Sequence, residues 1–161
     1  MKWRSMGRGM VFSFGAALVA GACGHDFEPP DRAERVREAE AQYSVTMFDS
    51  VSWSADSVRD FQGNTVYAEK CRRCHGTMGR GDTEYARERR LEMPSLVEPD
   101  WPLAALDTLR HVVYVGHEEG MPVFGKAGIT PREIDAVSFY LVHTLRPDVL
   151  GAAGGAPDER E

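Results

Sequence analysis

The stretch that decides the fold reads Cys71-Arg72-Arg73-Cys74-His75. Two cysteines three positions apart, with a histidine directly after the second, form the attachment signature of c-type haem. The two thiols can add to the two vinyl groups of the ring, and the histidine then offers an imidazole nitrogen to the iron. A redox pair or half of a zinc site are the alternatives, but the chain has no second cysteine pair. The motif therefore predicts one covalent haem c held by Cys71 and Cys74, with His75 as an iron ligand.

The N-terminus has the pattern of an export signal. A positively charged start precedes an uncharged apolar run at 10–22, which is shorter than the roughly 20 residues of a membrane span. The run ends in Ala20-Gly21-Ala22-Cys23, which resembles the processing site of bacterial lipoproteins. A lone thiol is also prone to oxidation in an exported protein. We expect residues 1–22 to form a signal peptide and Cys23 to carry a lipid; cleavage elsewhere nearby or an uncleaved anchor are the alternatives.

The flanks of the chain differ in composition from its centre. The net charge is −6 and most of the acidic excess lies in the two flanks, so there is no basic stripe of the kind that nucleic acid requires. Residues 23–57 are predicted to be a lipid-anchored tether, with a frayed helix at 31–42. An apolar patch at 45–57 is expected to pack on the following domain or on a partner. Residues 148–161 are small and charged and are predicted to be a disordered tail.

The compact domain is predicted over 58–147 and is all-α. A helix over 60–73 leads into the cysteine motif, and 103–115 has an apolar face near the helical period. The third helix starts at Thr130-Pro131-Arg132-Glu133, which has a capping threonine, a proline at the first helical position and a glutamate at the third. Pro147 is expected to end it. Long loops in so small a domain indicate a large cofactor at its centre.

A six-coordinate haem iron needs a second axial ligand. Met121 lies in the turn-rich stretch Gly120-Met121-Pro122, 46 residues after His75, and such a loop can cross to the opposite face of the ring. Ligation by histidine and methionine raises the reduction potential. Met121 is therefore predicted to be the second ligand. The other candidates are Met78, Met93, His111, His117 and His143.

Residues 63–145 resemble a class I cytochrome c domain. The resemblance rests on Gly63 and Tyr67 before the motif, Gly76, Gly79 and Gly81 after it, Met93-Pro94-Ser95-Leu96, and Gly120-Met121-Pro122. It implies an all-α class I cytochrome c fold, with three main helices and long loops around one covalently bound haem. It also implies that the first helix crosses the last at Val137, Tyr140 and Leu141. The carbonyl of Pro94 is then expected to orient His75 through a hydrogen bond.

Two further residues are candidates for contacts with the haem propionates. Trp101 can donate a hydrogen bond through its indole N–H. Arg110 can pair its charge with a propionate, because a buried charge needs a partner.

These features predict single-electron transfer and no enzymatic activity. The protein is expected to be a carrier tethered by lipid on the periplasmic side of a bacterial membrane, with redox proteins as partners. A membrane-bound respiratory or photosynthetic complex is the expected partner. The alternatives are a fixed cytochrome subunit of a larger membrane oxidoreductase, and a sensor or enzyme with five-coordinate haem.

Overall fold

The computed structural model describes residues 31–101, 105–118 and 120–154, so the predicted signal peptide and Cys23 lie outside the described residues. The described chain consists of helices and loops without a β-strand, as the all-α prediction requires. No helix in this part is both long and apolar enough to cross a bilayer. The α-helices are α1 (Arg32–Gln42), α2 (Asp56–Val66), α3 (Arg72–His75), α4 (Glu84–Glu88), α5 (Leu106–Val115), α6 (Pro131–Tyr140) and α7 (Arg146–Gly154). Two 3₁₀ helices, η1 (Val45–Phe48) and η3 (Phe124–Lys126), and two π turns, η2 (Tyr67–Cys71) and η4 (Leu141–Leu145), complete the order.

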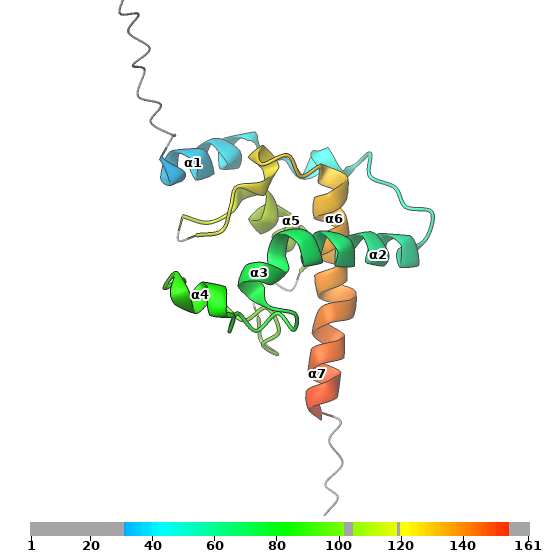
Figure 1. The fold of residues 1–161 in the computed structure, drawn as a ribbon. Helices are drawn as coiled ribbons and strands as arrows, with labels where there is room; N and C mark the ends of the chain where they lie inside the picture. The colour runs from blue at the N-terminus through cyan, green and yellow to red at the C-terminus, as the bar shows by residue number, and fades with distance from the viewer. Residues whose placement is uncertain (1–30, 102–104, 119, 155–161) are drawn as a thin grey trace, which may run out of the picture.

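The crossing of α2 and α6 is the central helix contact (Figure 1). A Cβ atom at position 63 would overlap the carbonyl oxygen of Ala136 and lie 2.6 Å from Cβ of Tyr140. Glycine alone lets the two backbones come this close. One turn further along, Tyr67 is 2% exposed and its ring centre lies 5.7 Å from that of Tyr140. The predicted crossing between the first and last helices of the domain is therefore present.

The first helix of the domain begins earlier than predicted and is not uniform. α2 starts at Asp56 rather than at residue 60, and the π turn η2 separates it from α3, which ends at His75. A π turn is a wider helical turn that occurs often at functional sites. It ends at Cys71, the first residue of the Cys-x-x-Cys-His motif, so the motif is carried on a continuous helical path.

The start of α6 has the predicted capping box. The hydroxyl of Thr130 accepts a hydrogen bond of 3.2 Å from the N–H of Glu133, and the Glu133 carboxylate accepts one of 2.8 Å from the N–H of Thr130. Pro131 takes the first helical position, where its missing N–H has no intrahelical partner to lose. Ile134 and Val137 then enter the core, with 0% and 1% of their surface exposed.

The prediction that Pro147 ends this helix is wrong. After η4 the chain continues as α7, with Pro147 in the first turn. The π turn interrupts the α-helical hydrogen-bond pattern before the proline, so Pro147 stands near the start of a new helical segment, where proline is tolerated. Residues 148–154 of the predicted disordered tail are therefore helical, and 155–161 lie outside the described residues.

The helix predicted at 31–42 packs on the domain. Ala39 of α1 is fully buried. Glu40 lies 2.9 Å from His111 of α5, and Glu38 forms an ion pair with Lys126 after the Met121 loop. These contacts make α1 part of the packed unit.

The apolar patch at 45–57 also packs on this chain. Of the two alternatives, packing on the following domain or on a partner, the structure has the first. Phe48 is 6% exposed and belongs to the hydrophobic core. The indole N–H of Trp53 donates a hydrogen bond of 2.7 Å to Asp135 of α6.

Asp135 is a buried carboxylate that joins four segments. It is 1% exposed and accepts hydrogen bonds from Trp53, from Arg59 of α2 at 2.6 Å, and from Nε of Arg110 of α5 at 3.0 Å. Burial raises the pKa of Asp135, but the hydrogen bonds from Arg110, Arg59 and Trp53 outweigh burial and leave it below the usual value. The interior charges of Arg59 and Arg110 are thereby paired.

Candidate functional site

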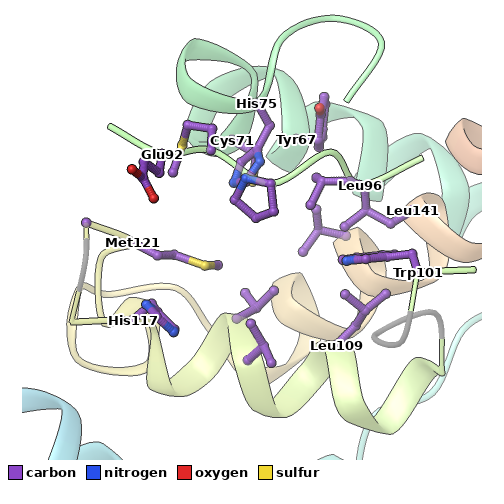
Figure 2. A pocket seen from close by; sticks show the side chains of 16 residues that line it. Tyr67, Cys71, His75, Glu92, Leu96, Trp101, Leu109, His117, Met121 and Leu141 are labelled. Carbon is purple, nitrogen blue, oxygen red and sulfur yellow. The ribbon is translucent and has the colours of Figure 1, made fainter. Parts of the chain in front are cut away.

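An apolar cavity lies between η2, α3, α5 and α6 (Figure 2). The cavity has a volume of about 220 Å³, and its apolar lining is typical of cofactor sites. Leu109, Val112 and Val113 of α5 form one wall, and Val137 and Leu141 form another. Such walls exclude water from whatever the cavity holds.

His75 lines this cavity at the end of α3. Gly76 follows with φ +81°, a conformation that ends the helix, and its carbonyl accepts a hydrogen bond of 2.7 Å from the Tyr67 hydroxyl. Burial lowers the pKa of His75, and the backbone carbonyl of Pro94 opposes this shift. The imidazole is therefore neutral near pH 7, the form that binds a metal. The Nδ1 atom of His75 is buried and forms no hydrogen bond of good geometry within the described residues. The carbonyl of Pro94 lies nearby but not in a position to accept one.

Cys71 and Cys74 lie at the side of the cavity. Cys71 lines it, and both cysteines line a smaller adjoining pocket that also includes His75 and Met121. Both thiols are free and half-buried. Burial, with a smaller effect from Cys74, raises the pKa of Cys71 to about 12. A thiol that stays protonated does not suit the thiolate chemistry of a redox pair.

The zinc alternative also lacks support in the ordered part of the chain. Within the described ranges, no group of three or more histidine, cysteine, aspartate or glutamate side chains could hold a metal ion. A zinc site would need about four such ligands.

Met121 reaches the same cavity from the loop after α5. Figure 2 shows its thioether directed into the cavity below His75. The N–H of His117 donates a hydrogen bond of 3.1 Å to the carbonyl of Met121. Gly116 has φ +76°, and a Cβ there would lie 2.5 Å from the carbonyl oxygen of Pro122. The loop that carries the thioether is therefore closed by its own backbone.

Two of the other ligand candidates line the cavity as well. Met93 precedes Pro94, on the segment that faces His75, and His117 lies below Met121 in Figure 2. His117 is exposed at the surface, whereas Met121 is half-buried. Met121 thus remains a candidate that lines the cavity and is shielded from solvent, which exposed His117 is not.

The remaining three candidates do not line the cavity. Met78 is 46% exposed. His111 pairs with Glu40, and His143 is exposed with its ring centre 4.3 Å from that of Phe139.

The two residues proposed for propionate contacts have different locations. Trp101 lines the cavity, and Figure 2 shows its indole nitrogen on the cavity side of the ring. Arg110 does not line it, which corrects that expectation. Leu109 of the same helix faces the cavity, so the helical period turns Arg110 away, where it bonds to Asp135 and, at 2.6 Å, to Asp107.

Sequence reasoning missed one buried residue next to the cavity, Arg146. It is 7% exposed and its Nη1 donates hydrogen bonds to the carbonyls of Leu96 at 2.8 Å and Glu98 at 3.0 Å. Because these contacts join residues 50 and 48 positions apart, no local pattern could have marked Arg146.

The residues around the cavity fit a haem. The wall offers a neutral imidazole and a thioether, both of which are axial ligands in cytochromes c. Two thiols lie at one side with the spacing of the attachment signature, and aliphatic side chains form the remaining walls. When bound, the haem supplies a one-electron couple at its iron.

Comparison with known proteins agrees with this fit. The sequence model of the family described as cytochrome C oxidase, cbb3-type, subunit III matches residues 59–141, just over half of the chain. No curated protein and no solved structure matches the chain. The matched region spans the motif, the cavity and the Met121 loop, and it indicates haem-based electron transfer. The chain therefore belongs to the cbb3-type cytochrome c oxidase subunit III family and has a class I cytochrome c domain.

Proposed function

We propose that this protein is a membrane-tethered monohaem carrier of single electrons, with Cys71 and Cys74 as thioether attachments and His75 and Met121 as axial ligands. One observation carries the proposal: the imidazole and the thioether line a single apolar cavity beside the two thiols. With His75 and Met121 both holding the haem iron, the protein would leave no site for a substrate there.

The surrounding residues define what the site does. The soft thioether of Met121 stabilises the ferrous state and raises the reduction potential. In the haem-loaded protein, the carbonyl of Pro94 would accept a hydrogen bond from Nδ1–H of His75, a contact that fixes the ring and strengthens the ligand. Apolar walls from α5 and α6 keep water away and lower the local dielectric.

The location of the carrier is also part of the proposal. Export, with residues 1–22 removed and Cys23 lipidated, would hold 58–147 near a bilayer on its periplasmic side. A tether raises the effective concentration of the carrier at a membrane-bound respiratory or photosynthetic complex.

The ligand assignment can be tested with carbon monoxide. The reduced wild-type protein is expected not to bind it, because Met121 occupies the sixth position. Met121→Ala should lower the potential and create a carbon monoxide site, whereas Met78→Ala, at an exposed methionine outside the cavity, should do neither. Rapid stoichiometric binding to the wild type would refute the carrier and favour a five-coordinate sensor or enzyme. An unchanged potential in Met121→Ala would assign the second ligand elsewhere.

A second candidate is a fixed subunit of a larger membrane oxidoreductase. The match to a family described as an oxidase subunit favours it. Purification of the native protein in mild detergent distinguishes the two. A chain that always elutes alone supports the free carrier, and stoichiometric co-purification with an oxidoreductase supports the subunit.

A further inference from the structure

Arg146 is a buried cation that has no anionic partner within the described residues. Its Nη1 bonds to two backbone carbonyls, those of Leu96 and Glu98, which carry no net charge. None of the ion pairs found in this part of the chain includes it. An arginine that is 7% exposed and has no anionic partner is costly, because the protein interior solvates charge poorly.

Two other arginines of the interior have the anionic partner that Arg146 lacks. Arg59 and Arg110 are also shielded from solvent, and both bond to the carboxylate of Asp135. Arg146 is the arginine with the least exposed surface in the described chain, yet it lacks an equivalent carboxylate.

Arg146 lies beside one wall of the haem cavity. Leu96, whose carbonyl it binds, lines the cavity, and the guanidinium carbon lies 5.2 Å from the ring centre of Trp101, which lines it too. Figure 2 shows Trp101 and Cys71 on opposite sides of the cavity. Haem carries its vinyl groups and its propionates on opposite halves of the ring. Attachment at Cys71 would therefore direct the propionates toward the side of Trp101 and Arg146.

We propose that Arg146 is the charge partner of a haem propionate and that it sets part of the reduction potential. This inference rests on the proposed function. The guanidinium has five N–H donors in a planar fork that matches a carboxylate, so the two carbonyl contacts leave donors for a propionate. The positive charge also stabilises the ferrous state relative to the ferric state.

The test compares midpoint potentials of the full-length, haem-loaded protein at pH 7. Arg146→Gln should shift the equilibrium roughly tenfold toward the oxidised form, which is ~59 mV for a one-electron couple. A unit charge about 10 Å away has an effect of this size at an effective dielectric constant near 20. Arg146→Lys keeps the charge and should stay within about twofold of the wild type. Arg37→Gln is the control: the residue is exposed on α1, where water and salt screen its charge, so its potential should stay within about twofold as well.

A folded Arg146→Gln protein with the wild-type potential would overturn the inference and leave Arg146 as a structural support for two carbonyls. If the Arg146→Gln protein does not accumulate, infrared difference spectra (oxidised minus reduced) of the wild type and of Arg146→Lys test the inference instead. The propionate carboxylate bands should differ between wild type and Arg146→Lys, and identical bands would also overturn the inference. Failure of the proposed function is distinguishable, because it appears in the wild type as absent covalent haem or rapid carbon monoxide binding.

Discussion

The backbone of Gly63 lies directly against the carbonyl of Ala136, with no room between them for a methyl group. Gly63→Ala should therefore push α2 and α6 apart and destabilise the protein by ~1–3 kcal/mol, even though alanine favours a helix more than glycine does. Urea unfolding measures the change. Gly151→Ala is the control, because its Cβ would meet nothing within 4 Å; it should be neutral or stabilising by up to ~1 kcal/mol. Equal effects at both sites would show that the crossing is not tightly packed.

Asp135→Asn should be among the most destabilising single changes. It leaves the guanidinium groups of Arg59 and Arg110 in the interior without a carboxylate, at a cost of ~3–5 kcal/mol. Asp107→Asn removes an exposed partner of Arg110 and should cost no more than ~1 kcal/mol. Similar losses in the two variants would contradict the importance of the buried carboxylate.

The same carboxylate predicts how stability depends on pH. The pKa of Asp135 in the folded protein lies below its usual value of 3.8. The unfolded chain therefore binds the proton more readily, and the contribution of Asp135 to stability is complete above pH 3.8 and is lost as the pH falls through the folded pKa. Acid titration of the unfolding free energy should show a shallower slope below pH 3.8 in Asp135→Asn than in the wild type. An unchanged slope would mean that other carboxylates control acid unfolding.

Tyr67→Phe should destabilise the turn after the haem motif. The change removes the hydroxyl that donates to the carbonyl of Gly76, and a lost hydrogen bond of this kind costs ~0.5–1.5 kcal/mol. Tyr140→Phe is the matched control, since its hydroxyl forms no hydrogen bond in the described part of the chain. Thermal unfolding of the two variants should show a loss for Tyr67→Phe alone.

Reversing the acidic charges of α1 should loosen the Met121 loop. Glu38 and Glu40 contact Lys126 and His111, which flank that loop in sequence. Glu38→Lys with Glu40→Lys should therefore make the amide hydrogens of 116–126 exchange several-fold faster. Glu34→Lys changes an exposed residue of α1 that has no ion pair in the described part of the chain, and it should leave the exchange unchanged. Slow exchange in both proteins would show that the loop does not depend on α1.

Sequence reasoning succeeded where the signal was local. The capping box at Thr130 and Glu133 is determined by four consecutive residues, and the structure has it. Pro147 also gave a local signal, but the prediction failed because the π turn before it changes the hydrogen-bond pattern that proline would interrupt. The start of α2 at Asp56 was missed because polar residues there resemble a linker.

Contacts between distant residues were not predictable. Arg110 is the residue type that often binds a propionate. No local sequence pattern indicates that it instead pairs with Asp135, 25 positions later. The packing of α1 on α5 has the same origin, because Glu40 and His111 are 71 positions apart. The class I cytochrome c resemblance supplied the helix crossing, but it does not reach α1 and implies nothing about the role of Asp135.

The contact of α1 with the Met121 loop also affects how the domain would be oriented relative to a membrane. A guanidinium nitrogen of Arg32 lies 3.4 Å from the carbonyl oxygen of Met121, so the chain enters the domain on the side of the proposed sixth ligand. From Cys23 to Arg32 there are nine residue steps, which reach at most ~30 Å when fully extended. With Cys23 acylated, the Met121 side of the domain would stay within that distance of the lipid headgroups. The end of α7, which lies away from α1 in Figure 1, would be turned toward the aqueous phase.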